Sequence, residues 1–211
     1  MRVAGRGWLM LMVAAFFGAD AVMEATCSAI GFLVAYYAFK AYRFSGNVFF
    51  KLLYLGFMAI SSAMIFRSSL IIILLSLSPA PFLTFIIKEA SLIQSLVRAL
   101  GYFLFIVAYV KQLKASKMEA LVLTPILVSP LIELACICML FYLVAHMLML
   151  LLSTRNRDLL FILSGFTLFL ASHALFFASI SYSVLYLVGH VVQLLGSLCF
   201  LTVLVRVTKA R

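Results

Sequence analysis

The stretch that decides the fold is VMEATCSAIGFLVAYYAFKAYRFSGNVFFKLLYLGF, residues 22–57, because the chain repeats its pattern once. Internal repeats are sought first, since a repeat that is missed leads to the wrong fold. Shifted by one fixed offset, this stretch lies over residues 131–166 without a gap. The identical pairs are Glu24/Glu133, Cys27/Cys136, Phe32/Phe141, Asn47/Asn156, Gly56/Gly165 and Phe57/Phe166.

A second block supports the same duplication. Residues 92–111 match residues 187–206, with Gly101 over Gly196 and Phe105 over Phe200. The sequence therefore predicts two related units, each with its own copy of both blocks.

Composition restricts the class of protein. Of the 211 residues, 67% are hydrophobic and only 10% are charged, and the mean hydropathy is +1.25, values outside the range of soluble domains. Apolar runs longer than about 18 residues recur, and each is typical of a membrane helix. Backbone groups in lipid must be satisfied internally, and runs without strict alternation exclude a β-barrel. The predicted fold class is all-α, a polytopic helical membrane protein.

The net charge of +10 does not indicate a nucleic-acid partner, because the basic residues are dispersed in short loops between apolar segments. This pattern follows the positive-inside rule. Attraction to anionic lipid headgroups also accounts for the position of these basic residues. The partners we expect are the lipid bilayer and other membrane subunits. We expect a cell-membrane protein with the basic loops and the C-terminus in the cytoplasm.

Loop charge also decides how residues 118–152 cross the membrane. They form either one long helix or a short span, broken near Pro125 and Pro130, followed by a full span. If the segment is broken, every basic cluster lies on the same face of the membrane, as the positive-inside rule requires. If it is one long helix, the clusters are divided between the two faces. The prediction is therefore about seven spans in a 3+1+3 arrangement of parallel repeats. The segments are a short N-terminal apolar segment (1–20), a first repeat (21–111), a linking span (112–130) and a second repeat (131–211). The N-terminal segment resembles an uncleaved signal helix, and it either forms a short first span or extends into the next one.

Parallel three-helix repeats joined by a linker are known from transporters. The sequence YAFKAYR at residues 37–43, together with Gly189-His190, resembles uncharacterised multi-pass membrane proteins of archaea. That resemblance implies a tandem three-helix membrane fold and no particular activity. No catalytic motif and no metal-ligand motif is recognisable, so the sequence does not indicate an enzyme.

Polar residues inside the spans indicate a candidate site, since ionisable groups are costly in a bilayer. Heights counted from the cytoplasmic end place His173, His190, Arg98 and Arg67 at about 20–25 Å, with Glu24 and Glu133 slightly further out. We expect a polar site in the outer half of the bilayer. The alternative is that these groups only hydrogen-bond helices together.

Helical spacing predicts that these groups share faces. Tyr186, His190 and Gln193 follow one stripe of the last span, and Gln94, Arg98 and Tyr102 follow one stripe of the third. Together with Glu24 and Glu133 they predict a pocket between the repeats.

Three functions could use this layer. In the first, His173 and His190 ligate a b-type haem for electron transfer, with Arg67 and Arg98 on the propionates. In the second, Arg98 binds a small solute or ion that is transported, and the glutamates gate it or couple it to protons. In the third, the protein is an accessory or scaffold subunit and binds no cofactor. Because all three histidines lie in the second repeat, we expect that repeat to hold the ligand.

Overall fold

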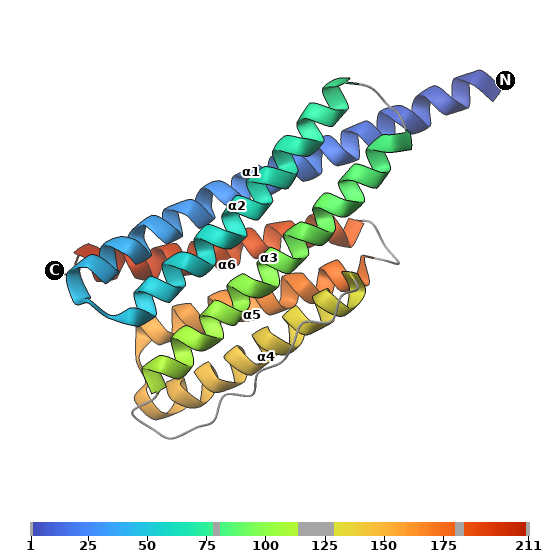
Figure 1. Cartoon of the computed structure of the whole chain (residues 1–211). Helices are drawn as coiled ribbons and strands as arrows, with labels where there is room; N and C mark the ends of the chain where they lie inside the picture. Colours follow the sequence, from blue (N-terminus) through green and yellow to red (C-terminus); the bar gives the residue numbers. More distant parts are fainter. Residues whose placement is uncertain (1, 78–80, 114–128, 180–183, 210–211) are drawn as a thin grey trace.

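The computed structural model describes residues 2–77, 81–113, 129–179 and 184–209, with side chains from 15–76, 86–111, 131–179 and 184–209. This part of the chain forms six helices and confirms the all-α prediction (Figure 1). All six are long and apolar enough to cross a membrane, as a multi-pass membrane protein requires. The helices are α1 (Arg2–Ser45), α2 (Val48–Leu77), α3 (Pro81–Leu113), α4 (Ser129–Thr154), α5 (Arg157–Ala178) and α6 (Val184–Lys209).

The predicted count of seven spans is not matched by the six helices of the described residues. Most of the predicted linking span, 112–130, lies outside those residues; its two ends belong to α3 and α4. The short N-terminal segment, 1–20, does not form a separate helix where it is described, because α1 runs unbroken from Arg2 to Ser45. Nothing in that stretch stops a helix, since it contains no proline.

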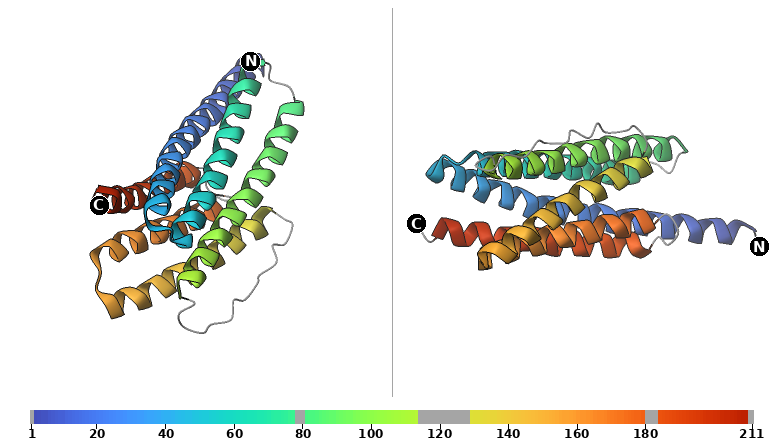
Figure 2. Two further views of the ribbon diagram at one scale, coloured as in Figure 1. Left: turned by 60° about the vertical axis from the view of Figure 1, so that its left-hand side comes forward. Right: turned by 90° about the horizontal axis from the view of Figure 1, so that it is seen from below.

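The helices form a closed ring in which each packs against the next and α6 packs against α1. Seen along the edge of the bundle, α2 and α3 make one layer and α5 and α6 another, while α1 and α4 cross obliquely between them (Figure 2). The units α1–α3 and α4–α6 run through the same sequence of directions, so α3 ends and α4 begins at opposite ends of the bundle (Figure 1). The two units thus face each other across a common interior.

One end of the bundle gathers most of the basic residues of the described helix ends, while Arg2 and Arg6 lie at the opposite end, where α1 begins. The α1–α2 turn, the α4–α5 turn and the C-terminal ends of α3 and α6 all lie at this end (Figure 1). We call it the basic end; its residues are Lys40, Arg43, Lys51, Lys111, Arg155, Arg157, Arg206 and Lys209.

The two units make their first turn in the same way. Gly46 has φ +64°, and Arg155, its equivalent, has φ +49°, so both turns require the left-handed region that glycine tolerates best. The following asparagine then caps the next helix: Asn47 accepts from the Phe49 N–H, and Asn156 accepts from the Asp158 N–H. The repeated Asn therefore has a local structural cause.

Glycines set the spacing inside each unit. A Cβ on Gly56 would overlap the Phe105 ring and lie 3.0 Å from the Gly101 carbonyl oxygen. In the second unit a Cβ on Gly196 would lie 3.0 Å from the Gly165 carbonyl oxygen, and one on Gly165 would overlap Phe200. The helices α2/α3 and α5/α6 thus pack by equivalent residues.

A buried aromatic cluster fills the interior toward the basic end. Its ring centroids lie 4.8–6.3 Å apart, distances typical of packed aromatic pairs. Both units contribute to this aromatic core, which consists of Phe57, Phe105, Phe166, Phe169 and Phe200. It leaves the opposite half of the interior to polar residues.

We expect Gly56→Leu to destabilise the protein by about 1–3 kcal/mol, because the new side chain must push α3 away. Gly18→Leu is the matched control, since no atom lies within 4 Å of a Cβ at Gly18. Thermal unfolding in detergent measures both. Equal melting temperatures for the two variants would contradict the close packing of α2 on α3.

Candidate functional site: a buried charged layer beside a cavity

Beyond the aromatic core, every helix places at least one polar side chain in the interior. The sequence positions these groups on successive turns: on α3, Gln94, Arg98 and Tyr102 are four residues apart and share a face. On α1, Asp20 and Glu24 are likewise one turn apart. The side chains of this charged layer come from both units and meet in two networks.

Arg67 is the centre of the first network. Its guanidinium nitrogens lie 3.0 Å from Asp20 Oδ2 and 2.7 Å from Glu24 Oε1, and its Nε–H donates to Ser91 Oγ at 2.9 Å. Gln94 donates to the same Glu24 oxygen at 2.8 Å. Glu24 is fully buried and Arg67 is 6% exposed, so the guanidinium partly neutralises the two carboxylates inside the bundle. This network joins α1, α2 and α3.

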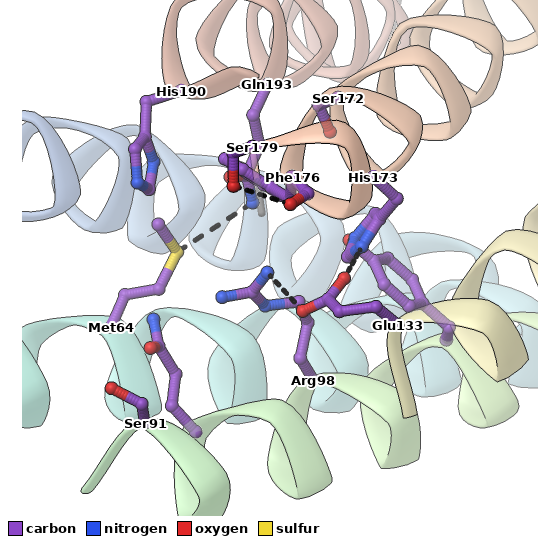
Figure 3. A network of polar contacts seen from close by, with 12 residues as sticks. Met64, Ser91, Arg98, Glu133, Ser172, His173, Phe176, Ser179, His190 and Gln193 are labelled. Atoms are coloured by element: carbon purple, nitrogen blue, oxygen red, sulfur yellow. Dashed lines mark hydrogen bonds and ion pairs between the residues drawn. The ribbon is translucent and has the colours of Figure 1, made fainter. Parts of the chain in front are cut away.

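Glu133 is the centre of the second network (Figure 3). Its Oε2 lies 2.6 Å from His173 Nδ1, and its Oε1 lies 3.6 Å from Arg98 Nη1. The other ring nitrogen of His173, Nε2, is 2.7 Å from the Tyr102 hydroxyl. The order Tyr102–His173–Glu133–Arg98 links α3, α4 and α5, and it holds a buried imidazole by both nitrogens.

His190 connects α6 to the first network. Its Nε2 lies 3.3 Å from Asp20 Oδ1, and its ring packs on Tyr186 with centroids 4.8 Å apart. One turn further on, the Gln193 amide reaches the Met64 sulfur at 4.0 Å (Figure 3). Through these contacts the charged layer closes around the whole ring of helices.

A cavity of about 450 Å³ lies on the side of this layer away from the aromatic core. Asp20, Arg67, Arg98 and Glu133 supply its charged wall. The other residues that line it are Phe16, Phe17, Ser91, Gln94, Ser95, Phe176, Phe177, Ser179 and Tyr186. The volume lies within the range of small-molecule sites.

Comparison with protein-family models, with curated proteins and with solved structures finds no match to this chain. The resemblance to archaeal membrane proteins therefore stays a prediction. Function must be argued from the residues of the site.

The residues predicted from the sequence lie together in the charged layer. They are Glu24, Arg67, Gln94, Arg98, Tyr102, Glu133, His173, Tyr186, His190 and Gln193. Sequence reasoning missed Asp20, because it assigned this residue to a separate N-terminal segment. The signal was present: Asp20 precedes Glu24 by one helical turn and therefore shares its face. It also missed Phe176, whose ring carries the Arg98 guanidinium at 5.6 Å.

The side chains do not fit a haem held by His173 and His190. Haem ligation requires a free nitrogen on each imidazole, and both nitrogens of His173 already contact Glu133 and Tyr102. The Phe176 ring packs against both imidazoles, with centroids 5.7 Å and 4.9 Å away. The glycines beside them leave no gap for a macrocycle, because phenyl rings fill the space at Gly165, Gly189 and Gly196.

We therefore expect the protein purified from haem-replete cells to show no Soret band. An absorption spectrum measures this directly. A Soret band that disappears in His173→Ala or in His190→Ala would contradict the expectation and establish the haem predicted from the sequence.

We expect Glu133→Ala to lower the free energy of unfolding by about 3–5 kcal/mol, because it leaves Arg98 and His173 buried without their shared carboxylate. Glu89→Ala, on the exposed side of α3, is the matched control and should change stability by less than about 0.5 kcal/mol. Unfolding in detergent measures both. A loss no larger than that of the control would show that the second network does not hold the bundle together.

Proposed function

We propose that the protein binds a small organic anion in the cavity and carries it across the membrane. Arg98 is the observation that supports this most directly. It lines the cavity, is 5% exposed, and its Nε has no hydrogen-bond partner among the described residues. A buried guanidinium with an unused donor favours an anionic ligand, since carboxylates match its geometry.

The two arginines are not equivalent. Arg67 lies within 3.0 Å of two carboxylates and donates to Ser91 as well. Arg98 has one ion pair, and that pair is long, at 3.6 Å. We infer that Arg67 serves the fold and that Arg98 is the cation available to a solute.

The walls of the cavity indicate the kind of anion. Aromatic side chains from α1, α5 and α6 face the cavity beside the charged residues, among them Phe16, Phe176 and Tyr186. Such walls stabilise a planar or apolar part of a ligand while a few polar groups fix its orientation. A small organic carboxylate suits both features better than an inorganic ion does.

The Glu133–His173 pair supplies a means of coupling to protons. A carboxylate that binds Arg98 would displace Glu133 from its cation, and Glu133 would then bind a proton in the low-dielectric interior. His173, in hydrogen-bond contact with Glu133, can exchange that proton. Anion and proton would thus enter together, with no net charge added to the layer.

We further propose that the basic end faces the cytoplasm, in keeping with the positive-inside rule. The cavity would then face outward, and the aromatic core would close the path to the cytoplasm. The arrangement of two units around a common interior suits a transporter that opens alternately to the two sides. If the layer only holds helices together, the protein is an accessory subunit of a membrane complex.

We expect small carboxylates supplied as a panel to raise the melting temperature of the purified protein, and Arg98→Ala to abolish that rise. Arg98→Lys should retain a weaker rise, because lysine keeps the charge without the planar pair of donors. Arg206→Ala, an exposed arginine at the basic end, is the control and should behave as wild type.

Uptake of the stabilising carboxylate into proteoliposomes, with and without a pH gradient, then tests transport. Stabilisation of Arg98→Ala equal to wild type would overturn the proposed site. Binding without uptake would leave a receptor in place of a transporter.

A further inference from the structure

Asp20, Glu24 and His190 form a separate cluster at the edge of the charged layer. Each offers one ligand atom, and these atoms lie within 4.8 Å of one another. The carboxylates come from adjacent turns of α1 and the imidazole from α6, and all three side chains are at most 1% exposed. Two carboxylates and a histidine in this arrangement are a recurrent donor set for metal ions.

The cluster has polar atoms without partners, among them one acceptor nitrogen of the neutral His190 ring. Asp20 Oδ1, Glu24 Oε2 and both ring nitrogens of His190 have no hydrogen-bond partner among the described residues. Buried polar atoms are nearly always paired, so several unpaired atoms on neighbouring side chains indicate a ligand. The contact between His190 Nε2 and Asp20 Oδ1, at 3.3 Å, does not have hydrogen-bond geometry.

That spacing agrees with coordination of a metal. Two ligand atoms each about 2.0–2.1 Å from a tetrahedral ion lie about 3.3–3.4 Å apart. A carboxylate oxygen of Glu24 lies within 4.8 Å of the other two ligand atoms. The geometry is close to that of a three-ligand site with an open position.

The outer contacts of the cluster resemble those that support metal ligands. Arg67 binds Asp20 through Oδ2 and Glu24 through Oε1, and Gln94 binds Glu24 through the same Oε1. Each carboxylate therefore has one oxygen held from outside and the other oxygen free, an arrangement that orients ligands toward an ion.

The charge balance at this point admits a divalent cation together with an anion. Asp20, Glu24 and Arg67 sum to −1 when the imidazole is neutral, and a net negative charge is costly inside a membrane. A divalent ion changes the sum to +1. Since Asp20 lines the cavity, an anion there could occupy the open position and complete the neutralisation.

We propose that Asp20, Glu24 and His190 bind one divalent first-row transition metal ion, of the Zn²⁺ or Mn²⁺ type, with an open position toward the cavity. The mixed oxygen and nitrogen donors favour this class over Ca²⁺ and Mg²⁺, which prefer oxygen alone. The site goes beyond anion binding at Arg98 and does not depend on it.

Equilibrium dialysis of the full chain against Zn²⁺ or Mn²⁺ alone tests the site, with a purification tag that contains no histidine. We expect one equivalent per chain in wild type, and binding at least about tenfold weaker in His190→Gln and in Asp20→Asn. His146→Gln is the matched control, because it removes a half-buried imidazole that lies outside both the cluster and the charged layer and should bind metal as wild type. Co²⁺ should give a visible ligand-field spectrum that is lost in Asp20→Asn. This spectrum tests the site even if His190→Gln does not fold.

Wild-type protein that retains no metal would overturn the proposal, and so would equal losses in His190→Gln and His146→Gln. Since the assay contains no organic anion, its failure is distinguishable from failure of the carboxylate site. Metal binding that persists in Arg98→Ala would show that the two sites are separate.

Discussion

The structure depends on the neutralisation of two arginines inside a bundle of apolar helices. An uncompensated charge is among the most costly groups that a membrane interior can hold, so Arg67 and Arg98 dictate where carboxylates must lie. Asp20 and Glu24 meet Arg67, and Glu133 meets Arg98. Because these partners come from different helices, each ion pair is also a constraint on helix rotation. The charged layer therefore holds the six helices together beside the cavity, and the aromatic core holds them together toward the basic end.

The two units share their scaffold and differ in their chemistry. Both use a left-handed turn, an asparagine cap and a close glycine contact between their second and third helices. At the polar positions they diverge: Met64 stands where the second unit has His173, and Arg67 stands where it has Phe176. The expectation that the second unit holds the ligand stays a prediction, but the first unit contributes to the cavity as well. Asp20, Glu24 and Arg67, all from α1 and α2, supply much of the charged wall of the cavity and its surroundings.

Hydropathy and loop charge predicted the features that depend only on position along the chain. These features are the helical membrane class, most span positions and the common depth of the polar residues. Those quantities follow from distance along a helix, at about 1.5 Å per residue. Which polar side chains contact one another depends on how each helix is rotated about its axis. That rotation cannot be read directly from the sequence. His173 and His190 lie at the same depth, as counted, but they face different carboxylates, Glu133 and Asp20. Asp20 was missed because its helix was divided at that residue, and a helix boundary is the least predictable feature of a segment without proline.

The two arginines differ in how firmly they are held, so one part of the charged layer is fixed and another part is available to a ligand. Arg67 is held by two carboxylates and a hydroxyl, so a ligand could displace it only by breaking contacts that join three helices. Arg98 contacts Glu133 at 3.6 Å and rests on the Phe176 ring, so the proposed anion would have to displace only one long ion pair. The displaced carboxylate already touches His173, whose other nitrogen is anchored by Tyr102. Binding of the proposed anion at Arg98 would therefore perturb a chain of contacts from α3 through α4 to α5, while the network around Arg67 would keep α1, α2 and α3 in place. A ligand that binds in the cavity would therefore displace side chains of the second unit first, while the helices of the first unit would stay in place.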